Sequence, residues 1–313
     1  KLKPKKPINP YLLLLIGILA VSTAAIFIRL ILLEASALVI AAYRLALSAL
    51  ISGVLLLISH KGERTPLNRK DIGLLVLSGV FLAAHFAAWI TSLEFISVSS
   101  SVILVTTTPL WVALLSPIVL KEKVGSRFYW GMAVAIIGGI FIAISGPCRL
   151  STTGLRCSGS VFERGSQTLW GMALALIGAW MASGYMLIGR KMRLKMDNLS
   201  YTTSVYTISA VVLILALILR GEKVLGYSPQ IYALFVALAV IPQLLGHSVL
   251  NYSLEVLPAT IVSMALLGEP VGSTILAVIF LNEIPSTLEI IGGIFILLGI
   301  VISVLPESKP NAA

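Results

Sequence analysis

The chain has 313 residues, of which 58% are hydrophobic and only 12% are charged, and its mean hydropathy is +1.01. Soluble domains carry about 25% charged residues, so this composition excludes an ordinary soluble domain and requires a lipid environment. A net charge of +10 can indicate a nucleic-acid partner, but here the basic residues stand at the ends of apolar segments, as membrane topology requires. We therefore expect the lipid bilayer as a partner, and no nucleic acid.

Ten continuous apolar segments follow one another along the chain. Each is close to the roughly 20 residues with which a helix crosses a hydrocarbon core of about 30 Å, and continuous apolar runs favour helices over barrel strands. The sequence thus predicts an all-α integral membrane protein with ten transmembrane helices, at about 10–28, 36–59, 72–92, 98–120, 127–145, 168–189, 199–219, 229–251, 258–281 and 286–305. The first segment follows KLKPKKP, so a cleavable signal peptide is the alternative for it.

Basic residues are distributed unequally between the two ends of these segments. If the N-terminus lies in the cytoplasm and the segments alternate, 16 of the 23 lysines and arginines fall on the inner side and six on the outer side. Arg44 is the one that remains, inside the second segment. Because cytoplasmic loops are rich in Lys and Arg, both termini are expected in the cytoplasm, and we expect the membrane to be a prokaryotic cell membrane.

The second half of the sequence repeats the first at an offset of 161 residues. Leucine matches would be common in so apolar a chain, whereas matches of Pro, Glu and Gly at one offset indicate a duplication. The matches are Gly17 with Gly178, Ser22 with Ser183, Arg29 with Arg190, Ser92-Leu93-Glu94 with Ser253-Leu254-Glu255, Pro109 with Pro270, Glu122 with Glu283, Gly131 with Gly292 and Gly138 with Gly299.

Each half holds five of the expected helices, in the ranges 10–146 and 168–306, joined by an external loop at 147–167. Because five is odd, the halves must have opposite orientations in the membrane. Inverted repeats recur in secondary transporters, whose substrate sites lie near the midplane beside broken helices. The alternative is a duplicated structural bundle without transport.

Stretches in both halves resemble a known family. PLWVALLSPIVLKEKVG at 109–125 and LGEPVGSTILAVIFLNEIPS at 267–286 resemble the two copies of the signature of the drug/metabolite transporter superfamily, EamA branch, and AAYRLALSAL at 41–50 resembles its second helix. The resemblance implies ten helices in a 5+5 inverted arrangement, a central cavity, alternating access and, typically, export of amino acids or other small metabolites. The first helix departs from the family, because GILAVSTAAIF lacks the tryptophan often found there.

Glu269 and Arg44 are the two clear charges inside the expected helices. Ionisable groups deep in a bilayer are costly and usually face the bundle interior. Helix rise places Arg44 roughly 12 Å from the outer end of its helix and Glu269 roughly 13 Å from the outer side, so both could lie at one depth. Two interpretations stay open: a structural ion pair, or a charge pair that binds a zwitterion or switches between states. Burial also favours the protonated carboxyl form, so protons are a candidate partner at Glu269.

Pro109 and Pro270 are repeat mates and predict a kink in the middle of two helices. Proline frees the carbonyl one turn earlier, which a membrane tolerates where protein or a wet cavity satisfies it. These kinks are candidates for shaping gates. Thr107 and Thr108 stand beside the first kink, and their hydroxyls either line a cavity or bond back to their own helix.

Further polar and aromatic side chains follow helical spacing. Gln243, His247 and Asn251 share one face of the eighth segment, which should line a cavity or bond neighbouring helices. His85 is a candidate for the cavity wall, and Trp89 for the cavity or the aromatic belt at the interface. Tyr43, beside Arg44, is a candidate for an aromatic cavity wall or an interface residue.

Cys148 and Cys157 both fall in the connecting loop, which the charge distribution places outside. In an oxidising exterior they could form a disulfide, the alternative being two free thiols. Two cysteines do not make up a metal site. No Walker A motif or nucleophile elbow is present, so neither ATP-driven transport, nor an enzyme, nor a cofactor is expected.

The sequence therefore predicts a secondary transporter, and specifically an exporter, of small polar or amphipathic metabolites such as amino acids. Its two inverted repeats would alternate access to a central cavity. The alternative is a channel or a lipid-handling membrane protein. A channel would need a continuous polar path, whereas this chain has isolated polar stripes.

Overall fold

The computed structural model describes residues 10–59, 67–119, 126–145, 148–151, 154–157 and 165–304. These residues are almost wholly helical, which confirms the predicted all-helical class. One short hairpin is present, formed by the antiparallel strands β1 (Cys148–Ser151) and β2 (Gly154–Cys157). The connecting loop expected at 147–167 is thus described only in part, and the residues expected to carry both termini into the cytoplasm, 1–9 and 305–313, lie outside the described residues.

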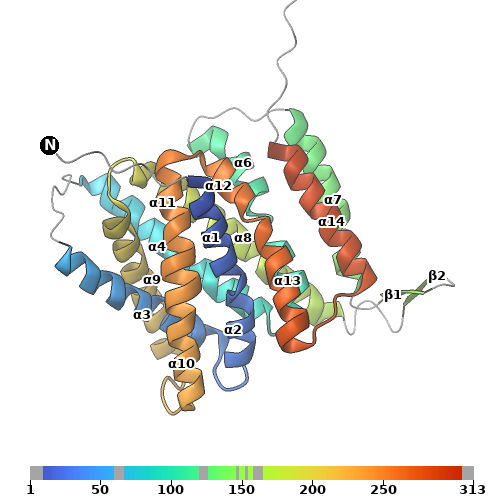
Figure 1. Cartoon of the computed structure of the whole chain (residues 1–313), viewed down its shortest axis with the longest axis horizontal. Helices are drawn as coiled ribbons and strands as arrows, with labels where there is room; N and C mark the ends of the chain where they lie inside the picture. The colour runs from blue at the N-terminus through green and yellow to red at the C-terminus, as the bar shows by residue number, and fades with distance from the viewer. Residues whose placement is uncertain are drawn as a thin grey trace, which may run out of the picture.

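The helices fall into two series that match the two halves of the sequence (Figure 1). The first series is α1 (Pro10–Ser22), α2 (Ala24–Ile31), α3 (Ala37–Ile58), α4 (Arg69–Ser92), α5 (Val98–Val105), α6 (Thr108–Val119) and α7 (Ser126–Ser145). The second series is α8 (Gly165–Arg193), α9 (Asn198–Arg220), α10 (Pro229–Leu238), the π-helix η1 (Ala239–His247), α11 (Ser248–Val256), α12 (Ala259–Ala265), α13 (Gly268–Leu281) and α14 (Thr287–Val304).

Polar residues fix where several helices begin. A side-chain oxygen just before the helix accepts a hydrogen bond from the backbone N–H three residues later, which satisfies one of the amides that the first turn leaves free. The residues that do so are Ser36 before α3, Asn68 before α4, Ser97 before α5, Asp197 before α9 and Ser228 before α10. Ser36 and Asp197 are separated by the repeat offset, so the duplication extends to the helix caps.

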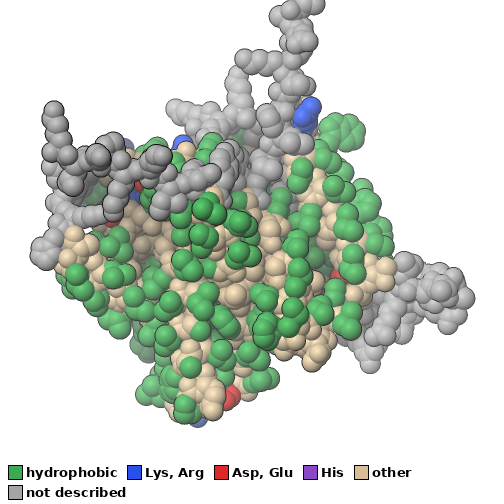
Figure 2. Space-filling view, in the orientation of Figure 1, with side chains coloured by type: hydrophobic (Ala, Val, Ile, Leu, Met, Phe, Trp, Pro, Cys, Tyr) green, Lys and Arg blue, Asp and Glu red, His purple; other side chains and the backbone are tan. Residues whose placement is uncertain are grey.

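Seven helical stretches are long and apolar enough to cross a membrane: Leu12–Ile31, Ala37–Ile58, Arg69–Ser92, Val98–Val119, Ser166–Arg193, Asn198–Arg220 and Pro229–Val256. Three shorter apolar helices follow, at Tyr129–Ile142, Gly268–Leu281 and Thr287–Gly299. Ten membrane crossings in a 5+5 arrangement therefore stay a prediction. Hydrophobic side chains are spread over the described part of the face in Figure 2, where few charged side chains show, as contact with lipid requires.

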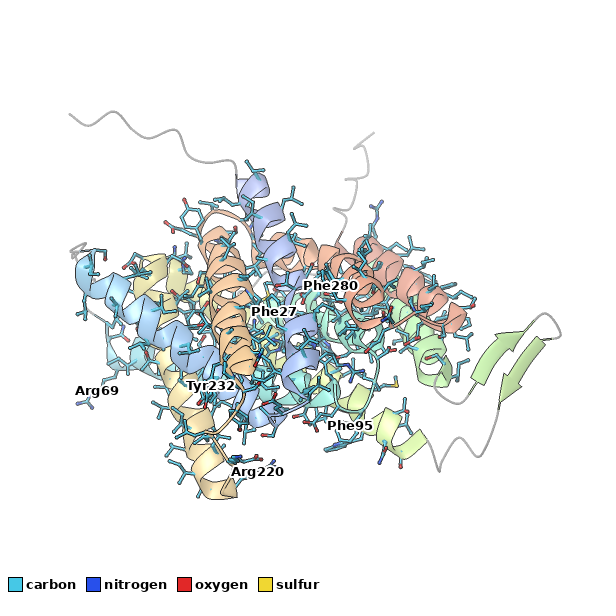
Figure 3. All side chains as sticks on the ribbon, turned by 60° about the horizontal axis from the view of Figure 1, so that its bottom comes forward. Phe27, Arg69, Phe95, Arg220, Tyr232 and Phe280 are labelled. Carbon is cyan, nitrogen blue, oxygen red and sulfur yellow. The ribbon has the colours of Figure 1, made fainter. Side chains whose placement is uncertain are left out.

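Helices of one half pack against helices of the other. α3 lies against α9, α4 against α8, α7 against α14, and α1 against η1 and α11. α3 and α9 are repeat mates, and so are α7 and α14. Each of these pairs therefore brings equivalent helices of the two halves into contact. In Figure 1 the pair of α7 and α14 stands at one side of the molecule. Side chains fill the space between the remaining helices, while Arg69 at the start of α4 points away from the bundle (Figure 3).

Glycines bring α7 and α14 into backbone contact. A Cβ added at Gly138 would lie 2.5 Å from the carbonyl oxygen of Gly292, and one at Gly299 would lie 2.4 Å from that of Gly131. Gly138 thus approaches Gly292, and Gly131 approaches Gly299 further along α14. Because the residue numbers rise along α14 as they fall along α7, the two helices run antiparallel. Gly138 and Gly292 thus allow close packing of the two helices, as small residues do in membrane bundles, whereas an added Cβ at Gly139 would meet nothing within 4 Å.

Two helices are broken at matching positions. α5 ends at Val105 and α6 begins at Thr108, and α12 ends at Ala265 and α13 begins at Gly268. Pro109 and Pro270 follow directly, at the second and third residues of the new helices. The breaks predicted from these prolines are present, because a proline cannot donate the hydrogen bond that would continue the preceding turn.

Candidate functional site

A cavity of ≈ 50 Å³ lies between α4, α8, η1, α11 and the two broken helices, α5–α6 and α12–α13. Six residues that the sequence singled out line it: His85, Trp89, Thr108, His247, Asn251 and Glu269. Its remaining lining is mainly apolar, from Val105, Thr106, Ala182, Tyr185, Met186, Leu250, Leu254 and Leu266. The structure therefore brings these six residues together around one cavity.

Glu269 is the one carboxylate among the residues that line this cavity. It stands in the first turn of α13 and is 8% exposed. Free backbone N–H groups give a helix N-terminus a partial positive charge, which favours a carboxylate there. Within the described residues, its carboxylate makes no hydrogen bond and no ion pair. The break in the helix thus supplies a partly compensated place for a charge that the cavity can reach.

Arg44 is fully buried in α3, but it does not pair with Glu269. Its Nε donates a hydrogen bond to Oε1 of Gln243 at 2.6 Å, and its Cζ lies 4.0 Å from the centre of the Phe86 ring. The two charges still attract each other across the intervening side chains. The structural ion pair considered from the sequence is therefore not formed in this conformation, because Arg44 points towards Gln243 and Phe86.

The three residues Gln243, His247 and Asn251 do not form one stripe. Residues Ala239–His247 form a π-helix that contains Pro242, and its wider turns shift side chains four residues apart out of register. Gln243 is fully buried towards Arg44, and its carbonyl accepts a hydrogen bond from Tyr206 at 3.4 Å. His247 and Asn251 line the cavity. Apart from Pro242, no residue pattern in this stretch indicates the change of helical pitch.

Asn251 and His85 are held in place by hydrogen bonds. The Nδ2 of Asn251 donates to the hydroxyl of Tyr185 and, at 2.9 Å, to the carbonyl of His247. The Nδ1 of His85 lies 2.9 Å from the carbonyl of Gly178. Trp89 is 3% exposed, with its ring 6.0 Å from that of His85 in a stacked arrangement. A place in the aromatic belt, one of the two interpretations of Trp89, is excluded by this burial.

Tyr43 does not line the central cavity. It stacks on Phe235 of α10 with ring centres 4.2 Å apart, and its hydroxyl donates to the carbonyl of Val224 at 2.7 Å. Tyr227 and Tyr232 complete this aromatic cluster, and Tyr232 is labelled in Figure 3. Neighbouring positions on a helix point in different directions, so Arg44 faces inwards while Tyr43 packs against the end of α10.

The threonines before Pro109 bond back to their own helix. Thr107 donates to the carbonyl of Leu104 at 2.7 Å, and Thr108 donates to that of Val105 at 2.9 Å. The Val105 carbonyl is the one that Pro109 frees, so the adjacent hydroxyl satisfies it. Back-bonding is thus confirmed for both threonines, and Thr108 alone of the two also lines the cavity.

Three aromatic residues belong to the site and were not predicted. Tyr185 lines the cavity and bonds Asn251, Phe86 covers one face of the Arg44 guanidinium, and Tyr206 bonds the backbone of Gln243. All three are buried. Their hydroxyls and rings follow no polar stripe in the sequence, and buried aromatic residues are common in any helical core.

The two cysteines stand opposite each other in the hairpin, since the register of β1 and β2 pairs Cys148 with Cys157. Directly opposed residues of an antiparallel pair have Cα atoms about 4.5–5.5 Å apart, which is within the range of disulfides. A disulfide between them stays a prediction.

Comparison with known proteins supports transport. The sequence model of the EamA-like transporter family matches the chain twice, at residues 8–144 and 169–305. "Uncharacterized transporter YdfC" of Bacillus subtilis is 24% identical over 245 residues, which cover 77% of this chain and 74% of that protein. An "Uncharacterized transporter" of Archaeoglobus fulgidus is 24% identical over 239 residues, covering 76% of this chain and 77% of that protein.

The fold also has a counterpart among solved structures. One crystal structure of a protein superposes with a TM-score of 0.65 at 16% sequence identity, and covers 94% of this chain and 95% of that one. At this identity the likeness concerns the fold alone. Nearly the whole chain, including both halves, takes part in it.

Proposed function

Because the chain belongs to the EamA-like transporter family, we propose that it is a secondary transporter that exports small polar or amphipathic metabolites, such as amino acids. The observation that carries the proposal is the cavity between two helix breaks at matching repeat positions, with Glu269 in its lining. Broken helices beside a site near the midplane are the form that such sites take in inverted-repeat transporters. We place the chain in a prokaryotic cell membrane with both termini in the cytoplasm.

Alternating access is supported by the way the halves pack. α7 and α14 are repeat mates that run antiparallel, as mates must if the repeats, 10–146 and 168–306, are inverted. Each half contributes one broken helix to the cavity. Rocking one half against the other would then exchange the side from which the cavity is reached, with the breaks at Pro109 and Pro270 as the bending points.

The size of the cavity favours a carrier over a channel. Pockets for small ligands are about 300–1,000 Å³, whereas a few water molecules fill ≈ 50 Å³. A metabolite can bind only after the helices rearrange, which is the behaviour of a carrier with a closed intermediate. A channel or lipid-handling protein remains the second candidate, and a continuous polar path would favour it.

Glu269 is the candidate proton site of this mechanism. It is buried, it faces the cavity, and it has no hydrogen-bond donor among the described side chains. Such a carboxylate can accept either a proton or a donor group of the substrate. If it takes both in turn, proton movement and substrate movement are coupled.

Counterflow in proteoliposomes tests the proposal. Vesicles preloaded with an unlabelled member of a panel of small metabolites should accumulate the labelled compound transiently, because carriers exchange and channels do not. Glu269→Gln should change the pH dependence of exchange. Glu34→Gln is the matched control, since Glu34 is an exposed carboxylate that does not line the cavity. Absence of counterflow for every compound, with uptake that follows the gradient alone, would favour the channel.

A further inference from the structure

Four buried nitrogen atoms without an acceptor gather around the guanidinium of Arg44. They are Nη1 and Nη2 of Arg44, Nε2 of Gln243 and Nε1 of Trp89. Gln243 bonds Arg44 directly, and the Arg44 Cζ lies 6.0 Å from the centre of the Trp89 ring. The other buried unpartnered atoms of the described residues belong to Ser116, Asn198 and Thr203, one in each. Unmet donors are therefore concentrated at one place in the molecule.

This concentration is costly for stability. A buried donor without an acceptor loses its hydration without compensation, and the loss is largest for a charged group. Arginine stays protonated in proteins, so Arg44 cannot escape the cost by losing its charge. No described side chain offers a carboxylate to Arg44, although Glu269 lies in the neighbouring cavity lining. A group outside the protein is needed to complete the hydrogen bonds.

One edge of the guanidinium of Arg44, formed by Nη1 and Nη2, has no hydrogen-bond partner. Phe86 covers one face at 4.0 Å, which is a cation–π contact and uses none of the N–H groups. The Nε atom is bound to Gln243, so the edge that carries Nη1 and Nη2 is the one without a hydrogen-bond acceptor. That edge can hold the two oxygens of a carboxylate, which is the pairing that arginine favours. A water molecule would satisfy the donors but would leave the charge unbalanced.

We propose that Arg44, Gln243 and Trp89 form a subsite for one carboxylate-sized anion beside the central cavity. Trp89 belongs to both places, because its ring lines the cavity while its Nε1 is one of the four donors. The inference rests on the proposed function in taking this anion to be the carboxylate of the transported metabolite. The substrate would place its anionic end at Arg44 and a hydrogen-bond-donating end at Glu269.

A small inorganic anion has the same chemistry as a carboxylate at this site, so the test must separate the two sources. Purified protein in detergent is heated with sodium acetate, sodium chloride or uncharged acetamide, each at the same concentration in the same low-salt buffer. A ligand that binds only the folded protein raises the unfolding temperature in proportion to its occupancy. Acetate is expected to raise it in a saturable way, and acetamide to leave it unchanged.

Arg44→Leu is the variant that identifies the site. It should abolish the acetate effect and should leave the unfolding temperature without added acetate or chloride equal to that of the natural protein or higher. The matched control is Arg193→Leu, because Arg193 is equally buried but bonds Glu255 and the carbonyl of Met196. This control should unfold at a lower temperature and keep the acetate effect.

Four outcomes are decisive. Stabilisation by chloride but not by acetate would keep the anion site and overturn the assignment to the substrate carboxylate. No effect of either anion, or a lower unfolding temperature for Arg44→Leu like that for Arg193→Leu, would overturn the subsite. Because binding is measured without transport, an acetate effect in a protein without counterflow would contradict the proposed transport and leave the subsite in place.

Discussion

Arg29 makes in the first half of the chain the hydrogen bond that Arg190 makes in the second. The Nη1 of Arg29 donates to the carbonyl of Leu93, and the Nη1 of Arg190 donates to that of Leu254 at 2.6 Å. Both the arginines and the carbonyls are separated by the repeat offset of 161 residues. The sequence duplication is thus also a duplicated contact. Arg29 of α2 bonds the backbone just after α4, and Arg190 of α8 bonds the backbone near the end of α11.

The Arg29 contact predicts unequal losses of stability. Arg29→Gln and Arg190→Gln should each destabilise the protein by about 1–2 kcal/mol, since each removes a charged donor from a carbonyl. The loss should be larger for Arg29, which also pairs with Glu283 at 2.9 Å. Thermal unfolding in detergent measures both. Arg220→Gln, at an exposed helix end, is the control, and an Arg29→Gln loss no larger than that of the control would contradict the prediction.

Packing between α7 and α14 predicts a strong contrast between adjacent glycines. Gly138→Ala should destabilise by about 1–3 kcal/mol, because the added Cβ would lie 2.5 Å from the Gly292 carbonyl and the helices must separate. Gly139→Ala should be neutral or stabilising by up to about 1 kcal/mol, because its Cβ meets nothing within 4 Å and alanine favours the helix. Equal unfolding temperatures for the two variants would show that the helices do not approach at Gly138.

The sequence predicted where the helices break but not how every side chain turns. The breaks are predictable because Pro109 and Pro270 have no backbone N–H and cannot donate the hydrogen bond that continues a helix. The approach of Arg44 to Glu269 was inferred from depth along each helix. Depth fixes the position along the axis, whereas the rotation about it depends on packing, and Arg44 turned towards Gln243.

The π-helix shows the same limit. Gln243, His247 and Asn251 would share a face of a regular α-helix, and the wider turns of Ala239–His247 separate the first from the other two. Only Pro242 hints at this change in the sequence. Trp89 illustrates the remaining limit, because tryptophan near a helix end is equally suited to an interface and to a buried wall.

The hairpin predicts a disulfide between Cys148 and Cys157, which its register pairs. In protein prepared without reductant, neither thiol should react with a maleimide, and both should react after reduction. Cys148→Ser leaves Cys157 without a partner, so this variant should be labelled in both conditions. Labelling of the natural protein before reduction would contradict the disulfide.

The contact of Glu34 with Ser228 predicts a pH-dependent helix start. The backbone N–H of Ser228 at 2.9 Å, helped by its hydroxyl at 2.7 Å, holds the pKa of Glu34 below its ordinary value of 4.5. A lowered pKa in the folded state means that the ionised carboxylate stabilises the contact above pH 4.5, and that this is lost as the pH falls through the folded pKa. Hydrogen exchange at the start of α10 should be slower in the natural protein than in Glu34→Gln at neutral pH, and equal in acid. A difference that persists in acid would contradict the role of the carboxylate.

Glu269 predicts the pH dependence of transport, because it is the one carboxylate of the cavity lining. Glu269→Gln keeps the size and hydrogen-bonding capacity of the side chain but cannot exchange a proton. Counterflow should therefore persist with a flat pH profile. Uptake driven by a proton gradient should fall at least about tenfold. Glu269→Asp, which keeps the carboxyl group, should retain a pH-dependent profile at reduced rate, since a shorter side chain displaces the group from the cavity. The three proteins are compared in proteoliposomes at two pH values, with and without a gradient. If Glu269→Gln keeps the natural pH profile and the natural response to the gradient, Glu269 holds the shape of the cavity and protons are coupled elsewhere or not at all.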